Sequence, residues 1–188
     1  MVRTRLLPAL TLAFGLGAGT LFGLMPAHAS AVSSASAADF LSYARRIYPL
    51  LAPCNDGATR VERDEVALVH AMKQGRFTTG RLSNDANDAA VACYTSMTKM
   101  EGMSVPLSLR GIPALAHMVN DTEKGYASYA LAANDIATAA DDINKQDYTK
   151  AGKLLTEGGS YFSGGARLFQ NALHEMNDTA HTLHIPGY

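Results

Sequence analysis

Two cysteines are the residues whose chemistry depends most on where the protein resides. Cys54 and Cys93 are the only cysteines of the chain, and 38 residues lie between them. In an oxidising compartment an even number of cysteines favours disulfide pairing. A two-thiol metal site or a redox pair is the alternative, but such sites typically use a C-x-x-C spacing. We therefore expect one Cys54–Cys93 disulfide.

Histidine and methionine side chains towards the C-terminus form a candidate haem or metal site. If the last two helices form a hairpin that turns near residue 145, the numbers of facing residues sum to about 291, which places His117 opposite His174. Imidazole and thioether groups are suitable ligands for non-covalent haem b or copper. The alternative is a set of core methionines and ordinary histidines. The candidate ligands are His117, Met118, His174, Met176 and His181.

A second group of soft ligands is the M-x-x-M-x-x-M run formed by Met97, Met100 and Met103. Thioethers at this spacing can bind Cu(I) in an oxidising compartment. Met97 and Met100 also share a helical stripe with Cys93, so the alternative is core packing.

One carboxylate lies where a helical projection predicts an apolar face. Glu65 falls inside the arc that contains Val61 and Val69. A buried carboxylate at this position would have a raised pKa and would be a candidate site residue. The commoner outcome for such a carboxylate is that it bends towards an arginine such as Arg45 or Arg46.

Motifs of the common catalytic and cofactor-binding classes are absent from the sequence. It contains no H-E-x-x-H, C-x-x-C-H, G-x-S-x-G or P-loop pattern, and its glycine pairs lack the lysine of a phosphate-binding loop. A formal net charge of −1 provides no electrostatic attraction for nucleic acid. We therefore expect a non-catalytic binding or accessory protein without a cofactor, whose partner is a small ligand or an envelope protein. A haem- or copper-binding bundle is the alternative.

The first 29 residues have the organisation of a secretory signal peptide. Arg3 and Arg5 precede an apolar run over 6–25, and small residues occupy both recognition positions of a cleavage site at 27–29. The alternative is an uncleaved membrane anchor, but a proline and four glycines disfavour a permanent helix. We expect cleavage near Ala29, a periplasmic or secreted protein, and no membrane span in the mature chain. A flexible leader is expected over 30–36.

The remaining residues, 37–188, are expected to form one all-α domain. Capping-box patterns predict helix starts at Ser36 and Thr59. Pro49 and Pro53 predict that the first of these helices ends near residue 50. The sequence therefore predicts two short helices in this part of the chain.

A third helix is expected from Ser83 to Gly102, followed by a packed, extended connection over 103–113. Pro113 suits the first position of the next helix. That helix is predicted to have one apolar face and one solvent face, the latter formed by Asp121, Lys124, Ser128, Asp135, Asp142 and Lys145.

The C-terminal residues predict a long antiparallel hairpin that turns at Lys145-Gln146, with Asp147 as the N-cap of the last helix. Two series with a spacing of seven continue along this helix. The first is small (Ala151, Gly158, Gly165, Ala172, Thr179), and the second is bulky (Leu155, Phe162, Phe169, Met176, Leu183).

Glycine pairs at 158–159 and 164–165 interrupt neither series. Each glycine costs about 1 kcal/mol of helix propensity, so a loop at this point is the alternative. The unbroken spacing favours one continuous helix whose glycines permit close approach of its neighbour. The sequence as a whole predicts an all-α bundle of four to five helices with a long C-terminal antiparallel helical hairpin.

Overall fold

The computed structural model describes residues 34–74 and 78–186. All regular structure in these ranges is helical: α1 (Ser34–Lys73), α2 (Gly80–Glu101), η1, a 3₁₀ turn (Leu107–Leu109), α3 (Pro113–Asn144) and α4 (Tyr148–Thr182). The expected signal peptide lies outside the described residues, as does the leader up to residue 33, whereas residues 34–36 belong to α1. None of the described helices is long and apolar enough to cross a bilayer.

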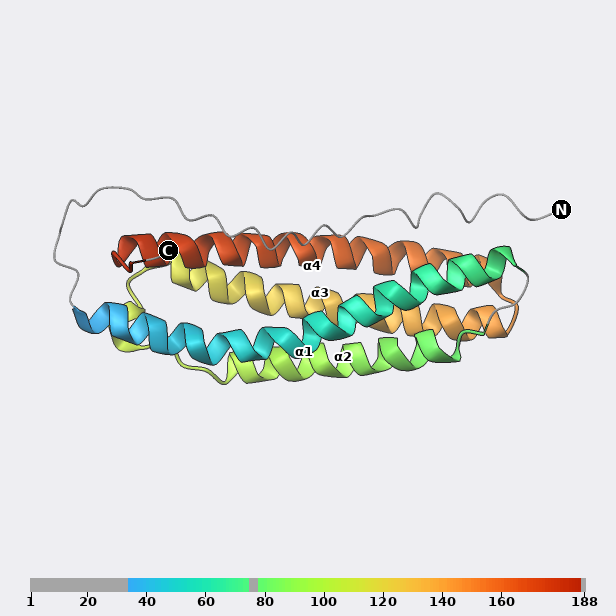
Figure 1. The fold of residues 1–188 in the computed structure, drawn as a ribbon, viewed down its shortest axis with the longest axis horizontal. Helices are drawn as coiled ribbons and strands as arrows, with labels where there is room; N and C mark the ends of the chain where they lie inside the picture. The colour runs from blue at the N-terminus through green and yellow to red at the C-terminus, as the bar shows by residue number, and fades with distance from the viewer. Residues whose placement is uncertain (1–33, 75–77, 187–188) are drawn as a thin grey trace.

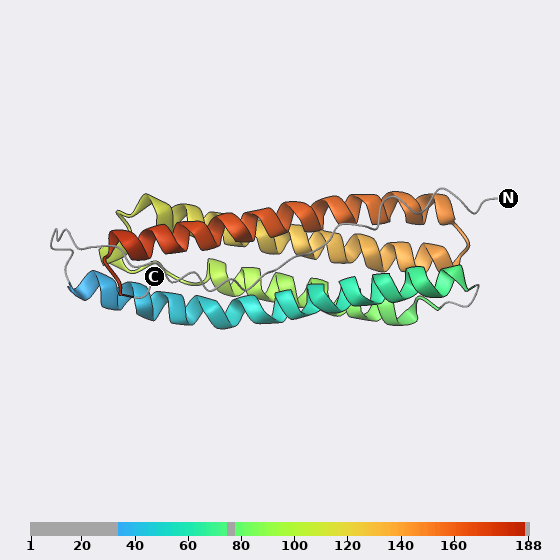
Figure 2. The same ribbon diagram turned by 45° about the horizontal axis from the view of Figure 1, so that its top comes forward.

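The four α-helices run up and down along the long axis of the molecule (Figure 1). A second view shows the same arrangement, with α1 and α2 side by side and α4 beside α3 (Figure 2). α1 packs mainly on α2, α2 on α3 and α3 on α4. The prediction of an all-α bundle is confirmed, and the described part of the chain contains four α-helices where the sequence predicted four to five.

α1 is one helix where the sequence predicted two. It continues through Pro49 and Pro53, whose rings are exposed. Thr59 does not begin a helix: its hydroxyl donates a hydrogen bond of 2.9 Å to the carbonyl of Asn55, one turn earlier in α1. A proline inside a helix costs about 3 kcal/mol, so packing of α1 against its neighbours must offset this cost.

The contact between α1 and α2 is closest around the disulfide. Cys54 and Cys93 are bonded to each other, as predicted, and their Cα atoms are 4.4 Å apart. One turn later, a Cβ added to Gly57 would lie 2.9 Å from the Cα of Ala89. This approach leaves no room for a side chain at residue 57.

α2 begins at Gly80, three residues before the predicted start at Ser83. The preceding Thr79 is buried, and its hydroxyl donates a hydrogen bond of 2.9 Å to the carbonyl of Ala140 in α3. This tertiary hydrogen bond fixes the start of α2 at the end of the bundle where α3 ends. The connection after α2 packs on the core through Leu109, and Pro113 begins α3 as predicted.

α4 is continuous through both glycine pairs, as the heptad spacing favoured. A Cβ at Gly158 would lie 3.2 Å from the carbonyl oxygen of Ala132, and one at Gly165 would lie 2.5 Å from the ring of Tyr129. Gly159 and Gly164 have open space around the same position. Close packing on α3 therefore explains one glycine of each pair.

An aromatic cluster fills the centre of the α3–α4 interface. The ring of Tyr129 packs edge-on against Phe162 and Phe169, with centroid distances of 5.2 and 5.1 Å. Tyr126 also packs edge-on against Phe169, at 5.2 Å. The bulky series of α4 therefore contributes to the core beside the small series.

The α3–α4 turn contains one residue that the sequence placed wrongly. Asp142 was predicted on the solvent face of α3, but it is buried and its Oδ2 lies 3.0 Å from Nζ of Lys150 in α4. Asp147 caps α4 as predicted, because its side chain accepts a hydrogen bond from the backbone N–H of Lys150. The pairing across the turn is what makes burial of Asp142 tolerable.

Candidate functional site

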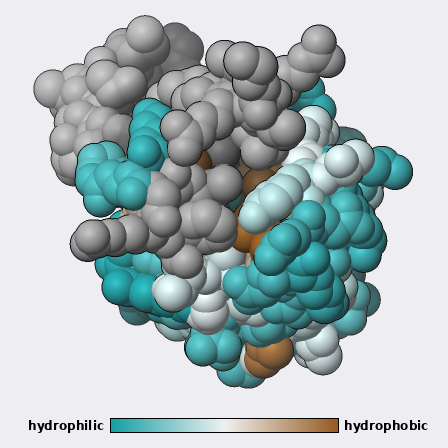
Figure 3. All heavy atoms as spheres, turned by 90° about the vertical axis from the view of Figure 1, so that its right-hand side faces the viewer, coloured by the Kyte–Doolittle hydropathy of each residue, from teal (hydrophilic) through white to brown (hydrophobic). Residues whose placement is uncertain are grey.

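A hollow of about 570 Å³ lies between the C-terminal half of α1 and the start of α2. We call it the α1–α2 hollow. Its apolar wall consists of Ala67, Leu68, Ala71 and Leu82, and its polar groups are Asp64, Thr78 and Arg81. Figure 3 faces this end of the bundle, where a few hydrophobic atoms show beside hydrophilic side chains. An apolar wall with a few polar groups is the usual composition of a small-molecule site.

Four charged side chains form a cluster beside the hollow: Asp64 and Arg63 of α1, and Arg81 and Asp85 of α2. We call them the acid–arginine cluster. Nε of Arg81 donates a hydrogen bond of 3.1 Å to Oδ2 of Asp64, and Nε of Arg63 lies 3.7 Å from Oδ1. The Asp64 side chain is only 6 % exposed, so its charge is balanced by two arginines that reach in from solvent.

The cluster places one side of Arg81 against carboxylates. Its Nε is 3.1 Å from Asp64 and 3.8 Å from Oδ2 of Asp85. Its two terminal amino groups form no hydrogen bond with the described residues. The Nε side of the guanidinium thus contacts carboxylates, while the edge formed by its two terminal amino groups remains available to a ligand.

The pKa of Asp64 is raised above its ordinary value. Burial is the largest cause, followed by a side-chain hydrogen bond with Asp85, and the charge of Arg81 opposes both. Asp85 therefore disfavours the charged form of Asp64, while the Arg81 guanidinium favours it.

The surrounding elements position the cluster from both sides. Leu68, one turn after Asp64 in α1, is buried, and Leu82 follows Arg81 in the first turns of α2 and is also buried. Thr79 ties the start of α2 to α3. The Cys54–Cys93 disulfide holds the middle of the same two helices together.

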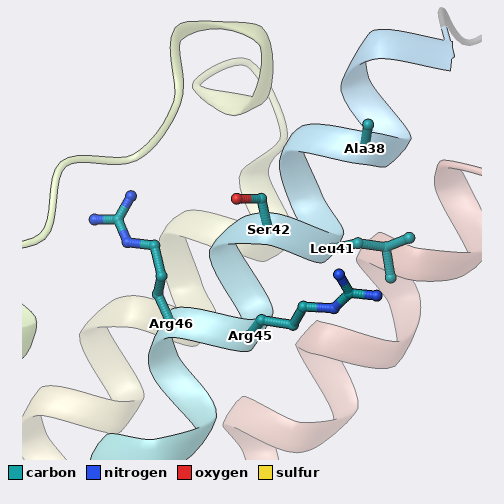
Figure 4. Close-up of a pocket in the computed structure, with 5 residues that line it drawn as sticks. All are labelled: Ala38, Leu41, Ser42, Arg45 and Arg46. Atoms are coloured by element: carbon teal, nitrogen blue, oxygen red, sulfur yellow. The ribbon is translucent and has the colours of Figure 1, made fainter.

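A second hollow, of about 400 Å³, lies along the N-terminal half of α1. Its lining includes Ala38, Leu41, Ser42, Arg45 and Arg46. Figure 4 shows that the guanidinium groups of Arg45 and Arg46 point in different directions, with Arg45 beside Leu41 and Arg46 on the other side of Ser42. These two arginines do not converge on one ligand group.

The predicted haem or metal ligands are distributed over different environments. His117, His174 and His181 are exposed, whereas Met118 is buried in the core and Met176 is half-buried. His117 and Met118 are consecutive in α3 and therefore leave the helix about 100° apart. Nε2 of His174 lies 3.5 Å from the Asp178 carboxylate. The described residues include no group of three or more His, Cys, Asp or Glu placed to hold a metal ion.

The methionine run is part of the core. Met100 is 1 % exposed, and Met97 and Met103 are half-buried against the core cluster. This is the packing alternative that the shared stripe with Cys93 indicated. Binding of Cu(I) by these residues stays a prediction.

Glu65 is half-buried and has no ion pair with any described residue, Arg45 and Arg46 included. Burial, together with the charge of Glu62 on the same helix, raises its pKa to about 7. The helical projection therefore found a carboxylate whose environment disfavours its charge.

The acid–arginine cluster is the site that sequence reasoning missed. Asp64 follows Val61 by three residues and precedes Leu68 by four, which is the spacing of one helical face. This spacing could have predicted that Asp64 is buried, because both apolar residues on the same face are buried. Arg81, its partner, belongs to another helix and has no local pattern.

No protein-family model, no curated protein and no solved structure matches this chain.

Proposed function

We propose that the protein is an exported, non-catalytic binding module of the cell envelope, and that the α1–α2 hollow is its ligand site. The observation that carries this proposal is the combination found there: an apolar wall beside a charged cluster whose buried carboxylate holds an exposed arginine. Pockets of this composition bind small molecules through apolar contact and orient them through a few polar groups.

Two further features support an exported protein. The sequence before residue 30 has the charge, apolar run and small residues of a secretory signal. The Cys54–Cys93 disulfide is the form that an oxidising compartment maintains. The proposal is accordingly a periplasmic or secreted protein that binds a small ligand or an envelope partner.

Native mass spectrometry of the protein purified from its own envelope tests this proposal. We expect a polypeptide that begins at Ser30 and carries a bound small molecule. Ala67→Trp, which fills the hollow, should abolish the added mass. Ala52→Trp is the matched control, because Ala52 is an exposed alanine of α1 that does not line the hollow.

Three results would count against the proposal. A wild-type protein without an added mass would show that no small molecule is bound. An added mass retained equally in both tryptophan variants would show that the ligand binds outside the hollow. A visible absorption band or bound copper that is lost in His117→Ala/His174→Ala would instead support the haem or copper alternative.

A further inference from the structure

The acid–arginine cluster shows which charge a ligand in the α1–α2 hollow would meet. The Asp64 side chain is 6 % exposed and Asp85 is 21 % exposed, whereas the guanidinium side chain of Arg81 is 69 % exposed. The two carboxylates are thus much less exposed than the guanidinium group of Arg81. A cationic ligand would meet Arg81 before either carboxylate, and like charges repel.

The geometry of Arg81 adds specificity for one kind of anion. Both carboxylate contacts of its side chain are made through Nε. The remaining edge carries two parallel N–H groups, a fork that matches the two oxygens of a carboxylate. Because Asp64 and Asp85 already hold the guanidinium, part of the entropy cost of ordering this side chain is met before a ligand binds.

The wall of the hollow defines the other end of the ligand. Ala67, Leu68, Ala71 and Leu82 offer methyl and isobutyl groups, and aromatic rings are absent from the described lining. Such a wall suits an alkyl chain, and the polar groups of the hollow are confined to Asp64, Thr78 and Arg81 among the described residues.

We propose that the α1–α2 hollow binds an amphiphile with a single carboxylate head and a short alkyl body, with the head on the outer edge of Arg81 and the body against Ala67, Ala71 and Leu82. This inference rests on the proposed function, because it names the ligand class of the same site.

Three eight-carbon probes separate the head group from the chain: octanoate, octylamine and octanol. Each is titrated into the full mature protein, and binding is followed by isothermal calorimetry and by ¹H–¹⁵N chemical shifts. We expect octanoate to bind at least tenfold more tightly than octylamine, with shift changes concentrated in 64–71 and 78–82. Added salt should weaken octanoate more than octanol.

The outcomes of the titration separate this inference from the proposed function. Octylamine or octanol binding in the hollow at least as tightly as octanoate would overturn the ligand class and leave the binding module standing. Absence of binding by all three probes would overturn the inference, while a ligand retained in native mass spectrometry would still support the proposed function.

Arginine variants test the role of Arg81 directly. Arg81→Gln should lower octanoate affinity at least tenfold and leave octanol affinity unchanged, and Arg81→Lys, which keeps the charge without the fork, should give a smaller loss. Arg63→Gln is the matched control, since Arg63 contacts the same Asp64 but does not line the hollow. Equal octanoate affinity in the Arg81→Gln and Arg63→Gln variants would overturn the assignment. Thermal unfolding of each variant identifies any that fail to fold. If Arg81→Gln fails to fold, Arg81→Lys takes its place in the comparison with Arg63→Gln.

Discussion

Ionisation of Glu65 should change the free energy of unfolding of the protein. Glu65 is half-buried, has no ion pair with the described residues, and lies near Glu62, whose charge also raises the pKa of Tyr129. Its pKa is about 7 in the folded protein and about 4.5 in the unfolded chain. Between these two values the folded protein binds more protons than the unfolded chain, so its stability falls as the pH rises.

We expect the contribution of Glu65 to the free energy of unfolding to be fully present below about pH 4.5 and to decrease by roughly 1–3 kcal/mol up to pH 7.5, because each pKa unit corresponds to about 1.4 kcal/mol and the group is partly solvated. Asp64, Glu123 and Asp135 also have raised pKa values and act in the same direction. Glu65→Gln should therefore stabilise the protein at pH 8 and have little effect at pH 5, as measured by urea unfolding. Destabilisation at both pH values would contradict the assignment.

Prediction of single residues succeeded where the relevant pattern was local. Asp147 was identified as an N-cap from its position at a helix start, whereas a site role for Glu65, which the helical projection singled out, stays a prediction. Asp142 was misplaced, because its burial depends on Lys150 across a turn. Asp64 was missed because it depends on Arg81, 17 residues away on another helix.

At the scale of elements, the helical spacing of residues could be predicted from the sequence, whereas the positions of some helix ends could not. The spacing of seven in α4 correctly favoured a continuous helix through glycines that propensity alone would break. In α1 the local signals at Pro49, Pro53 and Thr59 indicated an end and a new start, yet the helix continues. The close approach at Gly57, which no local rule reveals, shows how tightly α2 packs along that helix. Tertiary packing therefore decided where local signals and the fold disagreed.

In the two α4 glycine pairs, a glycine packed on α3 and a glycine with open space around it should respond oppositely to the same substitution. Gly165→Ala should destabilise the protein by about 1–2 kcal/mol, because the new methyl group meets the buried ring of Tyr129 at 2.5 Å, and overpacking outweighs the gain in helix propensity. Gly159→Ala is the matched control and should stabilise by up to about 1 kcal/mol, since nothing lies within 4 Å of the added group. Chemical denaturation of both variants measures the difference. Equal effects would mean that α3 and α4 are further apart than described.

For the whole molecule, the order of helix packing determines how its parts depend on one another. Since α3 packs most extensively on α4, this hairpin forms one strongly connected unit. α1 is attached chiefly through α2, and its contact with α3 is slight. The disulfide lies in the middle of the α1–α2 contact and closes a loop of 38 residues, for which chain entropy predicts about 4 kcal/mol.

Removing the disulfide should therefore affect the two halves of the bundle unequally. In Cys54→Ala/Cys93→Ala, or in the reduced wild-type protein, we expect the midpoint of thermal unfolding to fall by roughly 10 °C, since about 1 kcal/mol shifts a domain of this size by 2–4 °C. Hydrogen exchange should accelerate most in α1, because α1 has few contacts with α3 to hold it in place, while the centre of the α3–α4 hairpin keeps its protection. A reducing agent should have no effect on the double variant, which controls for reduction elsewhere. Uniform loss of protection across all four helices would show instead that the bundle unfolds as one cooperative unit and that α1 is no more dependent on the disulfide than α4.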